Sequence, residues 1–311
     1  MKQRILVTPR SATRSGHPSL AALEDAGYEV VFSRPGVLPT EEDLLRHLPG
    51  CVGYLAGVET VSASVLEKAK ELKVISRNGT GADAIDVAAA ERLGIKVLRA
   101  HGANARGVAE LAMALLLCIS RSLTQSDRSI KAQRWERHDG VELEGRMLGL
   151  VGCGQIGRLI TGLALAFGMK IVAYDPFATW KDAPDDFRYV PFDELLAGSD
   201  AISLHCPPGP DGRPILDRET IGKMKKGVIV INTARGGLID DAAMIEALDS
   251  GHVKGIGVDV FDNEPPNDWR LAQHPKAVSS PHIGGYTPES IDRAMDSAVR
   301  NLLEALGSRP V

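Results

Sequence analysis

Short apolar runs, rich in β-branched residues, alternate with amphipathic segments through the first third of the chain. Regular alternation of strand and helix patterns is typical of βαβ units, which build a parallel sheet covered by helices. We therefore expect a five-stranded doubly wound α/β domain here. Its predicted strands are Arg4–Thr8, Glu29–Phe32, Val52–Leu55, Val74–Ser76 and Lys96–Leu98, and its predicted helices are Ser19–Ala26, Thr40–His47, Ser62–Ala69 and Ala84–Leu93.

A second alternation begins at Met147, after one long helical stretch predicted from Asn104 to Gln133. Six strand patterns with intervening helices favour a second doubly wound sheet. The strands are Met147–Val151, Lys170–Tyr174, Ala201–His205, Val228–Asn232, Gly255–Val260 and Ala277–Ser280, and the helices are Gln155–Phe167, Phe192–Ala197, Arg218–Lys225 and Asp240–Asp249. A last amphipathic helix, Pro288–Leu306, is expected to pack back onto the first domain.

Composition and charge narrow the class of protein. The chain has 311 residues, with 36 Lys and Arg against 40 Asp and Glu, so its net charge is -4 and no basic surface for nucleic acid is expected. The longest apolar run, Leu111–Ile119, is about half the length of a membrane span and indicates a buried helix. The four cysteines are scattered without a CxxC pair, so we expect no disulfide framework, no metal site and a cytoplasmic location.

A glycine-rich loop stands at the start of the second sheet. Gly152, Gly154 and Gly157 form a GxGxxG pattern that follows an apolar strand and opens an amphipathic helix, and Asp175 ends the next strand. This context is the dinucleotide fingerprint, in which the glycines let a pyrophosphate approach the backbone at a helix N-terminus. Asp175 would accept hydrogen bonds from ribose hydroxyls and repel a 2′-phosphate, so NAD is favoured over NADP.

A nicotinamide cofactor implies hydride transfer, which needs a base for the hydroxyl proton of an alcohol. His282 follows a strand end beside two glycines, and His205, which ends another strand, is its rival. Arg235 at a strand end suits bidentate capture of a carboxylate. Glu264 could pair with His282 and orient its ring, whereas the buried acid Asp259 could serve structure or function.

Together these motifs resemble the NAD-dependent D-2-hydroxyacid dehydrogenases, and within them the 3-phosphoglycerate dehydrogenase-like branch. The resemblance covers nearly the whole chain and rests on RNGTGADAID, GANARGVAEL, GLVGCGQIG with YDP, INTARGGLID, GVDVFDNEPP and SPHIGGYT. It implies a catalytic trio in which Arg235 binds the substrate carboxylate, His282 exchanges the proton at the substrate oxygen and Glu264 sets the tautomer of His282. His205 then becomes a neighbour of the cofactor.

The resemblance also implies the rest of the site and the architecture. Asn78 and Gly79 would present backbone N–H groups to the substrate carboxylate, with Arg77 as a further candidate. Cofactor contacts would come from Gly152, Gly154, Gln155, Ile156, Gly157, Asp175, Cys206, Thr233, Ala234 and Asp259. A flavodoxin-like substrate-binding domain (residues 1–99 and 285–311) and a Rossmann NAD-binding domain (residues 100–284) would enclose the active site in a cleft. The Leu111–Ile119 helix fits the dimerisation region of the family, so a homodimer is expected.

The sequence departs from the family pattern in ways that leave the substrate open. Phosphoglycerate-specific members have an arginine after the third strand, where this chain has Ala56 and Gly57, although Arg77 or Arg137 could compensate. The regulatory domain of longer relatives is not expected. The substrate could therefore be 3-phosphoglycerate, glycerate with hydroxypyruvate, or a lactate-like acid. The alternative is a non-catalytic, NAD-sensing protein like the corepressor relatives, although the intact trio favours an enzyme.

Overall fold

The computed structural model describes residues 2–209 and 211–307 and divides into two compact units. Unit 1 comprises Met1–Asn104 with Thr287–Val311, and unit 2 comprises Ala105–Tyr286. The chain thus leaves unit 1 and returns to it, with boundaries close to the expected residues 99 and 285.

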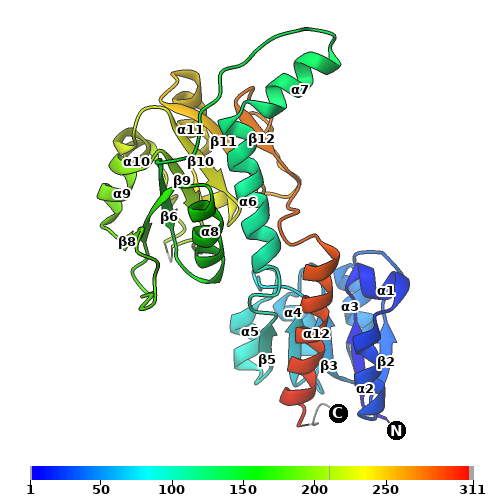
Figure 1. The fold of residues 1–311 in the computed structure, drawn as a ribbon. Helices are drawn as coiled ribbons and strands as arrows, with labels where there is room; N and C mark the ends of the chain where they lie inside the picture. The colour runs from blue at the N-terminus through cyan, green and yellow to red at the C-terminus, as the bar shows by residue number, and fades with distance from the viewer. Residues whose placement is uncertain (1, 210, 308–311) are drawn as a thin grey trace. The chain divides into compact units, whose positions relative to one another are not determined.

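Unit 1 is built on a parallel five-stranded sheet in the order β2-β1-β3-β4-β5 (Figure 1). The strands are β1 (Arg4–Val7), β2 (Glu29–Phe32), β3 (Cys51–Ala56), β4 (Val74–Arg77) and β5 (Lys96–Arg99). The helices are α1 (Arg10–Ser15), the 3-10 turn η1 (Pro18–Leu20), α2 (Ala21–Asp25), α3 (Glu41–His47), α4 (Ala63–Lys68), α5 (Val87–Arg92) and α12 (Pro288–Ala305). All five predicted strands are confirmed.

Helix α12 completes unit 1 from the far end of the chain. It packs on β3, β4 and β5, as its amphipathic pattern predicted (Figure 1). Its buried face includes Met295, Ala298 and Leu302, none of which is exposed to solvent. Helix α1 was not predicted, because the segment RSATRS buries only Ala12 and Thr13 and has no apolar stripe.

Unit 2 is built on a parallel seven-stranded sheet in the order β12-β11-β10-β9-β6-β7-β8. The strands are β6 (Met147–Val151), β7 (Lys170–Tyr174), β8 (Phe187–Tyr189), β9 (Ala201–Leu204), β10 (Val228–Asn232), β11 (Val253–Val258) and β12 (Ala277–Ser279). The helices are α6 (Ala105–Ser120), α7 (Leu123–Lys131), α8 (Gln155–Ala166), α9 (Phe192–Gly198), α10 (Arg218–Lys223), the 3-10 turn η2 (Gly236–Leu238) and α11 (Asp241–Asp249). The prediction of six strands was wrong by one, because the edge strand β8 has only three residues.

The long helix predicted from Asn104 to Gln133 is in fact two helices. The chain bends by 66° between α6 and α7, where Ser122 adopts a left-handed backbone with φ 49°. No single helix among the described residues is long and apolar enough to cross a membrane; only the bent α6–α7 pair meets that criterion, by length and composition alone.

Helix α6 lies against β10 and β11, and this explains its apolar sequence (Figure 1). Leu115, Leu116 and Ile119 are buried, so the expected burial of this run is confirmed. The close approach requires glycine on the sheet, since a Cβ at Gly257 would lie 2.8 Å from the Cβ of Leu115. Helix α6 therefore covers part of one face of the unit-2 sheet, the sheet whose strand β6 leads into the glycine loop.

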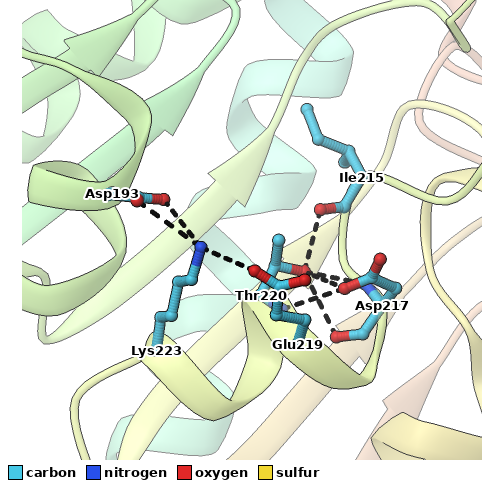
Figure 2. Close-up of polar contacts among 6 residues, drawn as sticks. All are labelled: Asp193, Ile215, Asp217, Glu219, Thr220 and Lys223. Carbon is cyan, nitrogen blue, oxygen red and sulfur yellow. Dashed lines mark hydrogen bonds and ion pairs between the residues drawn. The ribbon is translucent and has the colours of Figure 1, made fainter.

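Local hydrogen bonds fix the helix that precedes β10. Asp217 and Thr220 form a capping box in which each side chain accepts the other's backbone N–H, at 2.9 and 2.8 Å (Figure 2). Lys223 extends from α10 to Glu219 and to Asp193 of α9 (Figure 2). The capping box satisfies free N–H groups at the start of α10 and so defines the residue at which the helix begins. The position of α10 in turn defines where the chain enters β10.

Candidate active site

The glycine loop joins β6 to α8, and close backbone contacts exclude a side chain at two of its three motif glycines. Gly152 has φ 93°, and a Cβ there would lie 2.5 Å from the carbonyl oxygen of His205. A Cβ at Gly157 would lie 2.7 Å from the carbonyl oxygen of Gly152. Gly154 is different, because a Cβ there would meet nothing within 4 Å. The loop is therefore tightly packed on the protein side and open at Gly154, as a pyrophosphate cradle requires.

Gln155 and Ile156 form the first turn of α8, where Gly154 supplies no capping side chain. The backbone N–H groups of this turn are thus available to an anion, and the helix dipole favours negative charge there. The buried thiol of Cys153 lies in the loop itself, and burial raises its pKa, which supports the role of a small filler rather than a reactive group.

Asp175 follows β7 and fastens the loop from the neighbouring strand. Its carboxylate accepts the backbone N–H of Cys153 at 2.8 Å and those of Phe177 and Ala178 at 2.9 Å. Burial alone would raise the pKa of Asp175, but these three donors and the charge of Arg158 lower it below its ordinary value. The group is therefore ionised at neutral pH, as a negatively charged partner of the ribose must be.

Two buried polar atoms that follow strands β9 and β10 have no hydrogen-bond partner among the described residues: Nδ1 of His205 and the hydroxyl of Thr233. His205 and Cys206 follow β9, the strand beside β6, and Thr233 follows β10. The sheet order reverses direction between β6 and β9, and open α/β sheets bind ligands at such a point. Orphaned polar atoms at this edge support the prediction that Thr233 contacts a ligand.

The His205 ring gives unit 2 a specific sensitivity to acid. Burial lowers its pKa from 6.5 to about 3, and Nε2 contacts the Ser203 hydroxyl at 2.7 Å. Because the folded-state pKa lies below the unfolded value, the stabilisation is complete above pH 6.5 and is lost as the pH falls toward about 3.

We expect the free energy of unfolding of the wild type to fall by about 2 kcal/mol more than that of His205→Gln between pH 7 and pH 5. Urea denaturation of both proteins at the two pH values measures this difference. Equal losses in the two proteins would show that His205 does not titrate as its burial requires.

Arg235 follows Asn232 and Thr233 at the end of β10. Asn232 fixes this turn, since its side-chain amide donates to the Arg235 carbonyl at 2.8 Å and accepts the N–H of Ala234 at 3.1 Å. The half-buried Arg235 guanidinium donates to the Ala234 carbonyl at 2.7 Å. Its flat array of N–H donors thus stands on a rigid strand end, as carboxylate binding needs.

Gly236 brings the Arg235 turn against the loop that carries Glu264. A Cβ at Gly236 would lie 2.2 Å from the carbonyl carbon of Phe261 and 2.3 Å from the N of Asp262. No side chain fits in that space, so the two backbones touch. Sequence analysis assigned Gly236 no role beyond following the arginine, and the structure adds this backbone contact.

Glu264 and His282 form the central pair of the site. His282 Nδ1 lies 2.6 Å from Glu264 Oε2, and the other carboxylate oxygen accepts the N–H of Phe261 at 3.2 Å. The side chains are 52% and 37% exposed, so the pair can meet a ligand. The predicted pairing is confirmed: the carboxylate accepts Nδ1–H, so Nε2 is the ring nitrogen left to exchange a proton with a substrate.

Asp259 holds the His282 loop in place. His282 has φ 52°, a left-handed conformation that non-glycine residues rarely adopt. The buried Asp259 carboxylate accepts the N–H groups of Ile283 and Gly284, each at 2.8 Å, and the Ser280 hydroxyl at 2.6 Å. These three hydrogen bonds, one before His282 and two after it, hold the strained turn in place. Asp259 was predicted as a cofactor contact, and its positioning role, like that of Ser280, was missed.

Asn78 and Gly79, predicted to offer their N–H groups to a substrate carboxylate, have those groups engaged. The N–H of Asn78 donates to the Ala56 carbonyl at 2.9 Å, and that of Gly79 donates to the Arg77 carbonyl at 2.8 Å. The Arg77 side chain in turn donates to the Asn78 carbonyl. In this structure the loop thus satisfies its own backbone donors, and the role of Asn78 and Gly79 toward a substrate carboxylate stays a prediction.

No group of three or more His, Cys, Asp or Glu side chains suited to a metal ion occurs in residues 2–209 and 211–307. The candidate site consists of a helix N-terminus with open space at Gly154, a strand-end arginine and an imidazole–carboxylate pair. This combination defines a dinucleotide-binding oxidoreductase of the two-unit α/β class.

Comparison with known proteins identifies the family. Residues 113–284 match the D-isomer specific 2-hydroxyacid dehydrogenase, NAD binding domain. The chain is 44% identical over 273 residues to a hydroxypyruvate reductase of Thermotoga maritima, covering 86% of this chain and 89% of that one. It is 40% identical over 272 residues to a D-3-phosphoglycerate dehydrogenase of Mycobacterium leprae, covering 86% of this chain but 52% of the relative.

Among solved structures, the TT0316 protein of Thermus thermophilus superposes with a TM-score of 0.87 at 37% identity, covering 99% of this chain and 98% of that one. The chain therefore belongs to the D-isomer specific 2-hydroxyacid dehydrogenase family. NAD is its cofactor, and the open cradle at Gly154 and the ionised Asp175 fit that molecule.

Proposed function

We propose that this protein interconverts a D-2-hydroxy acid and its 2-keto acid with NAD, through Arg235, Glu264 and His282. The observation that carries the proposal is the contact of 2.6 Å between His282 Nδ1 and Glu264 Oε2, on a loop whose backbone touches the Arg235 turn. A hydroxypyruvate reductase and a D-3-phosphoglycerate dehydrogenase are both similar to the chain, so hydroxypyruvate or glycerate and 3-phosphoglycerate are the substrates to consider.

In the direction of keto-acid reduction, Arg235 binds the substrate carboxylate with two parallel N–H bonds. Protonated His282 gives its Nε2 proton to the substrate oxygen, and the Glu264 carboxylate stabilises the imidazolium that precedes this step. NADH held at the Gly154 loop and Asp175 would supply the hydride for C2. In the reverse direction neutral His282 takes the hydroxyl proton. Asp259 keeps the ring where this transfer is possible.

The alternative is an NAD-sensing binding protein without turnover. A pure sensor has no use for an imidazole held at hydrogen-bond distance by a carboxylate, so the pair favours the enzyme. The test is the absorbance of NADH with purified protein and a panel of hydroxypyruvate, glyoxylate, pyruvate and 3-phosphohydroxypyruvate. We expect rapid oxidation of NADH by at least one of them; tight NADH binding with no oxidation by any would favour the sensor.

The preference for NAD should depend on the charge of Asp175. In Asp175→Ala the repulsion of a 2′-phosphate disappears, so the ratio of kcat/KM with NADH to that with NADPH should fall at least about tenfold. The matched control is Asp182→Ala, which removes an exposed carboxylate from the segment after β7. An unchanged ratio in Asp175→Ala would contradict the role given to this carboxylate.

We also propose a homodimer in the cytoplasm. Leu123, Ile130 and Trp135, on α7 and just after it, are 57%, 54% and 81% exposed, and apolar side chains gathered in one segment favour a protein partner. The four cysteines are free thiols, which suits a reducing compartment. Sedimentation velocity distinguishes a dimer from a monomer or tetramer.

A further inference from the structure

A cation near Asp175 is not used in the mechanism above. Residues 176–180, which follow Asp175, include no arginine, but Arg158 of α8 is held against this segment. Its Nη2 donates to the Thr179 carbonyl at 3.1 Å, and its guanidinium carbon lies 5.2 Å from the centroid of the Trp180 ring. Arg158 therefore joins the helix that follows the glycine loop to the segment that follows Asp175.

The platform under the guanidinium is itself fixed in place. The Trp180 ring packs edge-on against Phe187 of β8, with ring centroids 5.3 Å apart, and Phe187 is buried. The backbone between Asp175 and Trp180 is held as well, because the Asp175 carboxylate accepts two N–H groups of this segment at 2.9 Å each. Arg158 thus has a defined place close to the carboxylate.

The guanidinium keeps its charge and most of its donors. Its two partners, a carbonyl and an aromatic ring, are neutral, and in the described part of the chain no ion pair includes Arg158. Arginine stays protonated in proteins, and one hydrogen bond leaves most of its N–H groups unused.

The charge of Arg158 reaches two parts of the cofactor site. Burial raises the pKa of Asp175, and this charge joins three backbone donors in lowering it. Burial also raises the pKa of the Cys153 thiol in the glycine loop, and the same charge opposes that rise. Arg158 therefore lies where it can act on an anion bound between the loop and Asp175.

A 2′-phosphate is the group for which this placement matters. NADP differs from NAD by a phosphate on the ribose that Asp175 is expected to bind. Guanidinium N–H groups form charge-assisted hydrogen bonds with phosphate oxygens, and such bonds are stronger than an exposed cation–π contact. The guanidinium can therefore leave the Trp180 ring for a phosphate. Asp175 and Arg158 act on a 2′-phosphate with opposite signs.

We propose that Arg158 is a specificity-determining residue of the cofactor site. In the wild type its charge offsets part of the repulsion between Asp175 and a 2′-phosphate, and once the carboxylate is neutralised it binds that phosphate directly. The preference for NAD thus depends on the balance of two charges and not on Asp175 alone. This inference concerns the binding of the cofactor and goes beyond the proposed turnover.

The test is fluorescence titration of NADH and NADPH, without substrate, into purified variants. Asp175→Asn removes the charge and keeps an amide oxygen that can accept the N–H groups of the loop, so the Kd for NADPH should fall at least about tenfold. Adding Arg158→Gln should reverse this gain about tenfold, whereas Arg158→Lys in its place should keep most of it, because the charge remains. With Asp175 intact, Arg158→Gln should raise the Kd for NADPH about threefold or more relative to that for NADH.

The matched control is Lys181→Gln in the Asp175→Asn background, because Lys181 is an exposed cation that directly follows the same segment. It should leave the Kd for NADPH within about twofold. The inference is overturned if Asp175→Asn/Arg158→Gln binds NADPH as tightly as Asp175→Asn, or if Lys181→Gln removes the gain instead.

The single variant Arg158→Gln decides if the double variant does not fold or if Asp175→Asn gains nothing. An unchanged ratio of the two Kd values in Arg158→Gln would then make Arg158 a structural residue only. Failure of the proposed function would leave all these titrations unaltered, because none of them includes a substrate.

Discussion

Replacing His282 with asparagine should lower kcat by about 10²–10⁴-fold and leave the affinity for NADH close to that of the wild type. The loss follows from removal of the group that exchanges the proton at the substrate oxygen. Asparagine is the sharper substitution, because it tolerates the left-handed backbone at this position, where φ is 52°. His282→Ala should show the same loss with an added cost in stability. Steady-state rates and NADH fluorescence titration measure the two quantities.

The matched control for His282 is His274→Asn. His274 Nε2 lies 3.2 Å from Asp249 Oδ1, so it too belongs to an imidazole–carboxylate pair of unit 2, but outside the motif loops. Its replacement should leave kcat within about twofold of the wild type. If His282→Asn keeps a wild-type kcat, another group exchanges the proton at the substrate oxygen, and the role given to His282 is wrong.

Arg235→Lys should lower kcat/KM for the keto acid about 100-fold, mainly through a higher KM. Lysine keeps the positive charge but cannot form two parallel N–H bonds to a carboxylate, and a hydrogen bond to a charged group contributes about 1.5–3 kcal/mol. NADH affinity should not change. Arg218→Lys is the control, since Arg218 makes a comparable guanidinium–carboxylate contact with Glu246 on the surface. A loss of NADH binding in Arg235→Lys would show that the arginine serves the cofactor instead of the substrate.

The sequence was most informative where backbone geometry demanded a particular residue. The GxGxxG pattern predicted a loop at the position where β6 is followed by α8. Only glycine fits against the His205 carbonyl at Gly152, and glycine at Gly154 leaves space beside the backbone. The His282–Glu264 pair was also predicted, but only through the family motifs. Spacing alone places these two residues 18 apart with no reason for contact.

The sequence was least informative where long-range hydrogen bonds decide the outcome. Asp259 lies inside an apolar strand pattern, and nothing local reveals that its carboxylate holds the N–H groups of Ile283 and Gly284. Asn78 and Gly79 have their N–H groups engaged by carbonyls of their own unit, which a motif cannot show. The bend at Ser122 was missed for a similar reason, since the helical pattern continues across it.

If Arg235 and His282 hold a keto acid in one orientation, its reduction gives a single enantiomer. The most direct measurement is chiral analysis of the hydroxy acid formed from the best keto acid of the panel and NADH. Only the D-hydroxy acid should form, in keeping with the family to which the chain belongs. Formation of the L-acid, or of a racemic mixture, would contradict it.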